Sequence, residues 1–218
     1  YQKLVDKDHE FNRQLNGIYR SKDGRWVLPH FGLNHLRDRM LSLLEACPDQ
    51  SSISKAVLKW DAIDLENAIA ELNLCGGMVR GNSEWLAEPH GTVLSKKPVI
   101  EIIKIGESDP EPIPSSSRPL GGVRVLDLTR ILAGPIAART LAEHGADVLM
   151  VTAENLPQVH AYVADTSHGK RSCFVDIKEN EGARKLKDLT IGADIFSQGY
   201  RPGAMEKLGF GPEELSEI

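Results

Sequence analysis

Hydrophobic and polar positions follow two different regularities along this chain. In the first half, strand-like runs are mixed with apolar residues at helix spacing. Asp23-Gly24 is typical of a hairpin turn, so we expect an antiparallel strand on each side of it. Asp61 precedes one helical stripe as its expected N-cap. The predicted elements are strands at residues 18–20, 25–28 and 99–105, and helices at residues 35–46, 52–58, 61–72 and from 83 onward. The first half is therefore predicted to be a small α+β domain.

The second half alternates strands with helices in a regular way. Apolar runs predict strands at residues 123–128, 147–151, 172–176 and 193–197, and amphipathic stretches predict helices at residues 136–144, 181–189 and 202–208. This order indicates an α/β fold, a Rossmann-like parallel sheet with flanking helices. Ligands of such sheets bind beyond the carboxyl ends of the strands. We therefore expect function in the loops that follow Leu128, Val151, Asp176 and Ser197.

A proline- and serine-rich stretch separates the two halves. Residues 107–119 hold four prolines and four serines, a composition that cannot build a core and favours an extended linker. The expected organisation is a small α+β domain at residues 1–106, a linker at 107–119, and the first part of a larger Rossmann-like domain at 120–218.

Composition excludes several classes of function. The formal net charge is −5, from 26 basic and 31 acidic residues, which argues against nucleic-acid binding. No apolar run approaches the roughly 18 residues that a membrane helix needs. Three widely spaced cysteines without a CxxC pair are typical of free thiols in a reducing compartment. We expect a cytoplasmic protein with no membrane or nucleic-acid partner.

Three common binding motifs are incomplete or absent in this sequence. The GKRS sequence at residues 169–172 lacks the first glycine of a phosphate-binding loop, because Ala164 stands there. No GxGxxG follows the first strand of the second half. The seven histidines show no metal-ligand spacing, so no metal is expected. Asp127 lies near a strand end, where catalytic carboxylates occur, but capping or pairing within the turn that includes Thr129 and Arg130 is the favoured interpretation.

An ordered set of motifs in the second half resembles the family III CoA-transferases, the group that includes formyl-CoA and carnitine CoA-transferases and the α-methylacyl-CoA racemases. The set consists of PLGGVRVLDLTRILAGP at residues 119–135, LAEHGADV at 141–148, GKRS at 169–172 with Asp176, Ala193-Asp194, YRPGA at 200–204 and LGF at 208–210. The first half resembles the family's small domain through YRSKDG at residues 19–24 and Trp26. In ordinary members that domain follows the large one, so the chain resembles an excerpt of a longer, tandem double-module protein.

The resemblance implies that coenzyme A or acyl-CoA binds along the strand ends as a substrate. The residues expected to contact it are Leu132, Ala133, Val175, Asp176, Ile177, Lys178, Gly199, Tyr200, Arg201 and Lys207. Taken singly, each of these residues is better explained by packing or by a solvated surface position, as Leu132 and Val175 by the core, Tyr200 by half-buried packing and Lys178 by solvation. Two departures from the family weaken the expected site. Thr152-Ala153 replaces the usual Glu-Arg pair, whose arginine helps to hold a CoA phosphate, and Gln198-Gly199-Tyr200 replaces Glu-Asn-Phe.

The family resemblance implies transfer of CoA between carboxylic acids through an aspartyl mixed anhydride. The catalytic aspartate is expected beyond Ile218, so no catalytic residue is predicted in this chain. A racemase-type enzyme and a non-catalytic CoA-binding or scaffolding module remain the alternatives. The partners implied are acyl-CoA and carboxylic acid substrates, together with either a second chain in an interlocked homodimer or a second module within one polypeptide.

Overall fold

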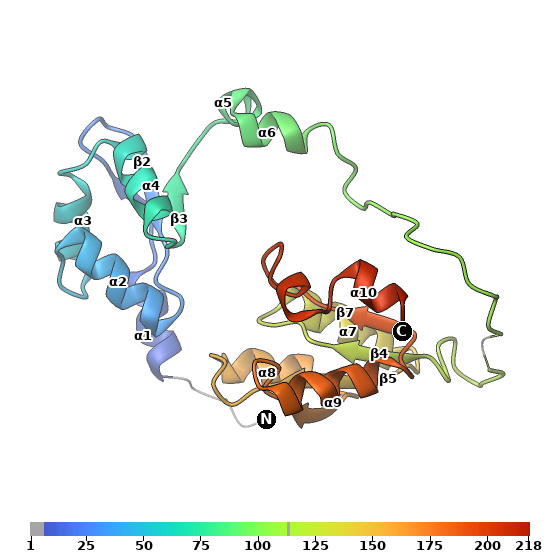
Figure 1. Ribbon diagram of the computed structural model, residues 1–218. Helices are drawn as coiled ribbons and strands as arrows, with labels where there is room; N and C mark the ends of the chain where they lie inside the picture. The colour runs from blue at the N-terminus through green and yellow to red at the C-terminus, as the bar shows by residue number, and fades with distance from the viewer. Residues whose placement is uncertain (1–6, 113) are drawn as a thin grey trace. The chain divides into compact units, whose positions relative to one another are not determined.

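The protein consists of two compact units in the computed structural model, which describes residues 7–112 and 114–218 (Figure 1). The first unit extends to Ile102 and the second begins at Ile103. Within the described residues, no helix is both long enough and apolar enough to cross a membrane.

The first unit packs helices around a three-stranded antiparallel sheet. Its strands are β1 (Tyr19–Arg20), β2 (Trp26–Pro29) and β3 (Gly76–Met78), in the order β1-β2-β3. Its helices are α1 (Lys7–Leu15), α2 (Asn34–Leu44), α3 (Gln50–Val57), α4 (Ala62–Glu71), α5 (Asn82–Ala87) and α6 (Pro89–Leu94). The predicted hairpin and the helices at 35–46, 52–58 and 61–72 are confirmed. Strand β3 was not predicted, because two of its three residues are glycines, which have little intrinsic preference for strands. Backbone pairing with β2 holds these residues in the extended conformation.

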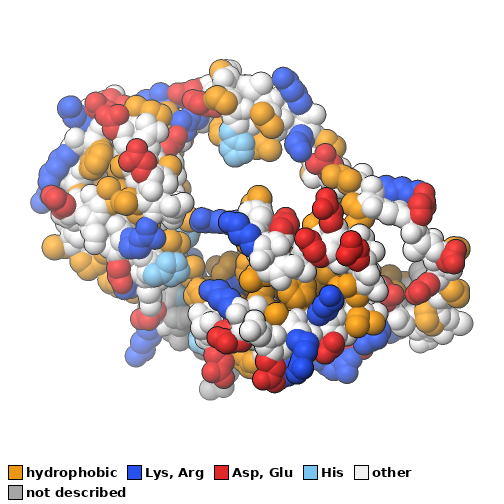
Figure 2. Space-filling view, viewed as in Figure 1, with side chains coloured by type: hydrophobic (Ala, Val, Ile, Leu, Met, Phe, Trp, Pro, Cys, Tyr) orange, Lys and Arg blue, Asp and Glu red, His pale blue; other side chains and the backbone are white. Residues whose placement is uncertain are grey.

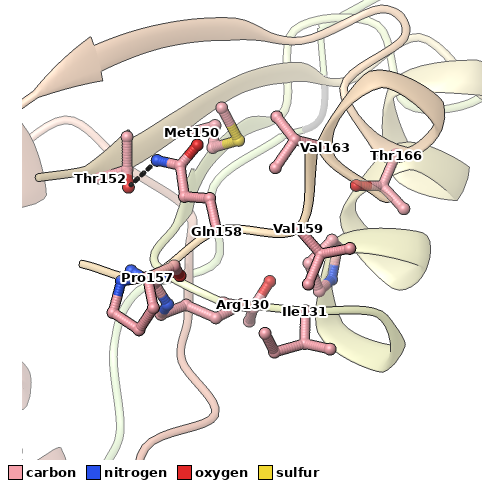
Figure 3. A pocket seen from close by; sticks show the side chains of 11 residues that line it. Arg130, Ile131, Met150, Thr152, Pro157, Gln158, Val159, Val163 and Thr166 are labelled. Carbon is pink, nitrogen blue, oxygen red and sulfur yellow. Dashed lines mark hydrogen bonds between the residues drawn. The ribbon is translucent and has the colours of Figure 1, made fainter. Parts of the chain in front are cut away.

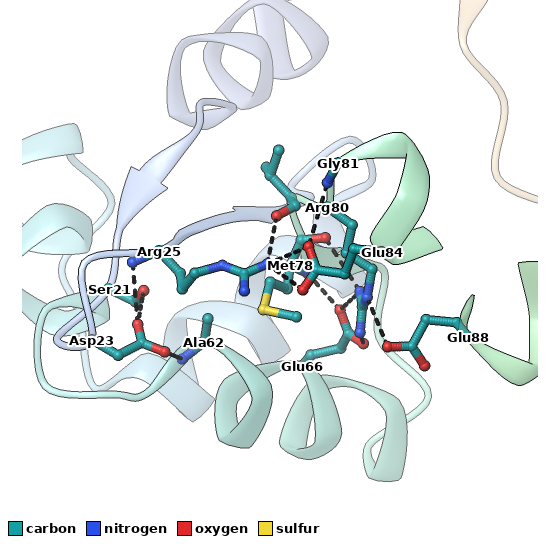
Figure 4. Close-up of polar contacts among 11 residues, drawn as sticks. Ser21, Asp23, Arg25, Ala62, Glu66, Met78, Arg80, Gly81, Glu84 and Glu88 are labelled. Atoms are coloured by element: carbon teal, nitrogen blue, oxygen red, sulfur yellow. Dashed lines mark hydrogen bonds and ion pairs between the residues drawn. The ribbon is translucent and has the colours of Figure 1, made fainter. Parts of the chain in front are cut away.

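Polar contacts tie the elements of the first unit together (Figure 4). Both carboxylate oxygens of Glu66 on α4 accept hydrogen bonds from Arg80, over 2.6 and 2.7 Å. Glu88 lies 3.3 Å from the same guanidinium. The Asp23 carboxylate accepts a hydrogen bond from the Ala62 N–H at the start of α4, over 3.2 Å. Asp61 occupies the N-cap position, but its side chain makes no capping hydrogen bond, so that part of the prediction is wrong.

The predicted strand at residues 99–105 is also wrong. This segment has no regular secondary structure. Its apolar side chains are largely exposed, from 63% for Ile105 to 104% for Val99. A strand is stable only when its backbone N–H and C=O groups pair with a neighbour, and within the described residues none pairs here. High strand propensity alone therefore does not order the segment.

The second unit is a parallel sheet with helices on both faces, which confirms the predicted α/β class. Its strands run in the order β6-β5-β4-β7, and all neighbours are parallel. Along the chain the elements are β4 (Arg124–Asp127), α7 (Ala133–Glu143), β5 (Asp147–Thr152), α8 (His160–Thr166), β6 (Arg171–Phe174), α9 (Asn180–Thr190), β7 (Ile195–Ser197), η1 (Glu206–Leu208) and α10 (Pro212–Ser216). The predicted helix at 202–208 is reduced to the single 3₁₀ turn η1. Gly203 has a φ of +79°, a left-handed conformation that a right-handed helix cannot include.

Alternate residues of the central strands face two separate cores. Val125 and Val148 pack against Ala138 and Ala142 of α7 on one face. On the other face, a second buried cluster contains Leu126, Leu128, Val151, Leu186, Met205 and Phe210. This alternation follows from the two-residue period of a strand. Because the chain passes from β4 to β5 on one side and returns to β7 on the other, a crevice is expected between the loops after β4 and β7.

Charge is dispersed over the face of the molecule that Figure 2 shows. On the face that Figure 2 shows, basic and acidic side chains are interspersed over each unit, with hydrophobic side chains between them. Such a mixture lacks the single-sign field of a nucleic-acid-binding face.

Candidate functional site

A large pocket lies at the carboxyl ends of the parallel strands. Its volume is about 460 Å³. We call it the strand-end pocket. It is lined by Leu128, Val151, Thr152, Ala153, Asn155, Leu156, Val175, Asp176, Ile177, Lys178, Tyr200, Ala204, Met205, Lys207 and Leu208. The end of β5 and the segments that follow all four strands contribute, because parallel strands present their carboxyl ends at one edge of the sheet.

Six of the ten predicted CoA-contacting residues line this pocket. They are Val175, Asp176, Ile177, Lys178, Tyr200 and Lys207. Gly199 and Arg201 flank Tyr200, are exposed, and are not among the lining residues. Leu132 and Ala133 are exposed at the start of α7 and line neither this pocket nor the second cavity described below. The structure thus brings six predicted residues that follow β6 and β7 together at one pocket. Their contact with CoA remains a prediction.

Asp176 holds two walls of the strand-end pocket together. One carboxylate oxygen accepts a hydrogen bond from Asn155 Nδ2 in the loop after β5, over 2.9 Å. The other accepts the backbone N–H of Lys178, over 3.0 Å. Both acceptor oxygens are therefore used within the protein, which favours a structural rather than a ligand-binding role for this carboxylate.

The charged groups that the pocket offers to a ligand are cations. Within the described residues, the ammonium groups of Lys178 and Lys207 have no hydrogen-bond or ion-pair partner. Both side chains belong to exposed residues at the pocket wall. Two solvated cations beside an apolar pocket suit a ligand with an apolar body and anionic groups.

A buried ion pair lies beneath the first loop of the sheet. Lys170 Nζ is 2.8 Å from Asp127 Oδ2, and the two side chains are 1% and 0% exposed. The same ammonium donates to the Pro135 carbonyl at the start of α7, over 2.9 Å. Asp127 Oδ1 accepts hydrogen bonds from the backbone and hydroxyl of Thr129. The interpretation that Asp127 caps the turn that includes Thr129 and Arg130 is confirmed by its bonds to Thr129.

The loop between β4 and α7 is strained. Ile131 has a φ of +68°, a region that β-branched residues avoid at a cost of order 1–3 kcal/mol. Gly134 permits the loop to fold closely, because a Cβ there would collide with the Thr129 side chain. A second, smaller cavity lies beside this loop, and we call it the loop cavity (Figure 3). It shares Thr152 with the strand-end pocket.

The first of the two departures noted in the sequence falls at the pocket wall, whereas only Tyr200 of the second lines the pocket. Thr152 and Ala153 both line the strand-end pocket, at the point where the family pattern places Glu-Arg. Ala153 is 6% exposed and brings no charge. This position of the pocket wall therefore lacks the cation that the family resemblance led us to expect.

Sequence reasoning missed Lys170 and several lining residues. Asn155, Leu156 and Met205 line the pocket, and the rule that loops after strand ends carry function already pointed to the first two. In the sequence, Lys170 belongs to a failed phosphate-loop motif and to the GKRS motif of the family resemblance, and neither assigns its side chain a partner. No local pattern predicts that its side chain pairs with a carboxylate 43 residues earlier in the chain. Among the described residues, no group of three or more His, Cys, Asp or Glu side chains is placed to hold a metal ion.

Comparison with known proteins agrees with this architecture. An α/β unit with a pocket beyond its strand ends has the architecture of the doubly wound parallel-sheet proteins, whose ligands bind at that edge of the sheet. Residues 120–218 match the family described as CoA-transferase family III. An acetyl-coenzyme A transferase of Hypoxylon pulicicidum is 32% identical over 94% of this chain and 37% of its own length. An acyl-CoA transferase of Gibberella moniliformis is 30% identical over 98% of this chain and 41% of its own length.

A mouse protein named succinyl-CoA:glutarate CoA-transferase is 36% identical over 47% of this chain and 26% of its own length. With these matches, residues 120–218 belong to CoA-transferase family III. The chain spans only 37–41% of the length of the two fungal relatives that match nearly all of it.

Proposed function

We propose that this chain is part of an enzyme that transfers CoA between carboxylic acids, and that the strand-end pocket binds the CoA moiety. The observation that carries the proposal is that six residues expected to contact CoA come together in one pocket of a family III member. The names of the relatives support the activity, since they are called acetyl-CoA, acyl-CoA and succinyl-CoA transferases.

The pocket has the chemistry that CoA requires. Its volume of about 460 Å³ falls in the range of roughly 300–1,000 Å³ typical of small-molecule sites. Leu128, Val151 and Met205 provide an apolar floor. Tyr200 offers an aromatic face for stacking, and Lys178 and Lys207 offer cations for the phosphates. Arg201, exposed beside Tyr200, adds a further cation at the rim.

The acyl transfer itself requires a nucleophile, which we place outside residues 1–218. In the proposed reaction, an aspartate carboxylate attacks the thioester carbonyl of acyl-CoA and expels the CoA thiolate. The thiolate then attacks the aspartyl carbonyl of this mixed anhydride, which releases the donor carboxylate and leaves an aspartyl-CoA thioester. The acceptor carboxylate attacks that thioester and expels the thiolate, and the thiolate attacks the acyl carbonyl of the second anhydride, which gives the new acyl-CoA and regenerates the aspartate. Residues of this chain would hold the CoA while the acyl group moves.

Trapping with hydroxylamine tests the transfer reaction in the full-length protein. After incubation with acyl-CoA and hydroxylamine, mass spectrometry should find one aspartate converted to a hydroxamate. An unmodified protein that exchanges the α-proton of a 2-methylacyl-CoA for deuterium would instead be a racemase-type enzyme.

Ala153 and Thr152 favour a second candidate, a module that binds CoA weakly or only supports an active partner module. Loss of the cation at this wall removes a charge-assisted hydrogen bond. The presence or absence of an aspartate in the corresponding loop of the full-length protein's second module separates the two candidates. Substituting that aspartate by asparagine should abolish transfer if the module is catalytic.

We further infer that the working unit pairs two modules, either as a homodimer or within one polypeptide. Light scattering of the full-length protein, read against its chain length, tests this inference. The free thiols of Cys47, Cys75 and Cys173 support a reducing compartment such as the cytoplasm.

A further inference from the structure

Arg130 is a cation with no counterion among the residues that the structure describes. One of its terminal nitrogens, Nη2, donates to the backbone carbonyl of Pro157. The other, Nη1, is buried and has no hydrogen-bond acceptor among the described residues. None of the ion pairs formed by the described residues includes Arg130. A buried guanidinium nitrogen without an acceptor is costly, because water is lost and nothing replaces it.

The cavity beside Arg130 contains no negative charge. Residues of the β4–α7 loop, β5 and the segment leading into α8 surround it (Figure 3). The lining residues are Thr129, Arg130, Ile131, Pro135, Met150, Thr152, Pro157, Gln158, Val159, Val163 and Thr166. Arg130 is the one charged member of this set. A ligand that satisfies the cavity must therefore bring the acceptor and the negative charge itself.

The size of the loop cavity limits what fits. Its volume is about 40 Å³. This is less than a tenth of the roughly 460 Å³ of the strand-end pocket, so the loop cavity has room for a small anionic group but not for the body of a CoA-sized ligand. A carboxylate meets this requirement.

Two further contacts prepare the cavity for an anion. Thr152 Oγ1 accepts a hydrogen bond from Gln158 Nε2 over 3.4 Å, so the Thr152 hydroxyl proton remains available to donate. The Arg130 backbone is held between Thr129, which bonds to buried Asp127, and strained Ile131. Its side chain is anchored at Pro157. The guanidinium is thus preorganised rather than recruited by the ligand.

We propose that the loop cavity binds the carboxylate of the carboxylic acid substrate, with Arg130 as the residue that recognises it. This inference rests on the proposed CoA-transferase function for the identity of the acid. Thr152 borders both the loop cavity and the strand-end pocket, so an acid held by Arg130 lies next to the proposed CoA site. Arg130 recognises the substrate through charge and fork geometry and transfers no proton.

The test compares Arg130→Gln with wild type and with Arg184→Gln in the full-length protein. Arg184 is a matched control, an exposed arginine on α9 outside both cavities. Binding of ¹³C-labelled succinate and acetate is followed by NMR without CoA, and CoA binding is measured separately by calorimetry. We expect Arg130→Gln to weaken succinate binding roughly 10- to 100-fold, as loss of a charge-assisted hydrogen bond predicts. Arg184→Gln should match wild type, and CoA affinity should not change.

Two more variants and a competition experiment test the inference further. Arg130→Lys should restore part of the succinate affinity, and Thr152→Val, which leaves the guanidinium in place, should weaken it several-fold. Inorganic phosphate should not compete. Equal succinate affinity in Arg130→Gln and wild type, no binding to wild type, or competition by phosphate would each overturn the inference. Arg130-dependent succinate binding in a protein that binds no CoA would uphold the inference and overturn the proposed function.

Discussion

Lys170 and Asp127 form an ion pair in which both side chains are almost wholly excluded from solvent, with Nζ and Oδ2 2.8 Å apart. The pair joins the start of β6 to the end of β4, and the Pro135 carbonyl adds the start of α7. Thr129 completes the coordination of the Asp127 carboxylate. The two residues therefore fix the loop from which both Arg130 and the N-terminus of α7 project.

Removing one member of this pair should destabilise the second unit strongly. Lys170→Met leaves an uncompensated buried carboxylate, a change that costs about 3–5 kcal/mol. Urea unfolding followed by far-ultraviolet circular dichroism measures the loss. The double variant Asp127→Asn/Lys170→Met should recover part of it, because neither charge then remains unpaired.

The exposed pair of Lys185 and Glu181 supplies the control. Their nitrogen and oxygen are 2.8 Å apart, but the side chains are 58% and 68% exposed. Lys185→Met should leave the unfolding midpoint unchanged within error. A midpoint for Lys170→Met equal to that of Lys185→Met would show that the buried pair does not stabilise the unit.

The close approach of Gly134 to Thr129 gives a second prediction. Gly134→Ala introduces a Cβ that collides with the Thr129 side chain, so one of them must shift. Overpacking of this kind costs about 1–3 kcal/mol. Gly106→Ala is the matched control, since a Cβ there meets nothing within 4 Å. Equal thermal midpoints for the two variants would contradict the packing described for this loop.

The third prediction concerns pH and the first unit. Hydrogen bonds from Arg80 lower the pKa of Glu66 below its ordinary value of 4.5, against an opposing effect of burial. A carboxyl whose pKa is lower in the folded state stabilises the protein above its unfolded pKa. That contribution is lost as the pH falls through the folded value. Wild type should therefore lose more stability between pH 6 and pH 3 than Glu66→Gln does.

Tryptophan fluorescence during urea unfolding measures this difference, because Trp26, Trp60 and Trp85 all lie in the first unit. Glu71→Gln, at the exposed end of α4, controls for the loss of a carboxylate alone. Parallel pH profiles for wild type and Glu66→Gln would show that the Glu66–Arg80 contact contributes no pH-dependent stability.

Local patterns predicted most of the second unit. Each of its strands begins or ends within a few residues of its expected position, because apolar runs bounded by glycine and proline are strong signals. Predictions failed where order depends on partners. The apolar segment at residues 99–105 has strand propensity but no paired neighbour, whereas β3 contains two glycines and is ordered by pairing with β2. Register and pairing are properties of the fold that a single segment does not carry.

The candidate site was only partly predicted, because some of its contacts also depend on partners that are distant in the sequence. Tyr200 and Lys207 could be placed by the family motifs and by the rule for strand-end loops. The Asp127–Lys170 pair joins side chains 43 residues apart in the sequence. The contact that holds the Arg130 side chain at the Pro157 carbonyl joins residues 27 positions apart. Such contacts arise from tertiary packing, so no spacing in the sequence reveals them.

Calorimetric titration of CoA into the full-length protein tests the central claim, that the strand-end pocket binds CoA. Ala153→Arg should restore the charge-assisted hydrogen bond missing from the wall, worth about 1.5–3 kcal/mol, and tighten binding by roughly one to two decades. Tyr200→Ala and Lys207→Ala should weaken it, while Lys185→Ala, outside the pocket, should not. If wild type binds no CoA at millimolar concentration and Ala153→Arg changes nothing, the strand-end pocket is not a CoA site.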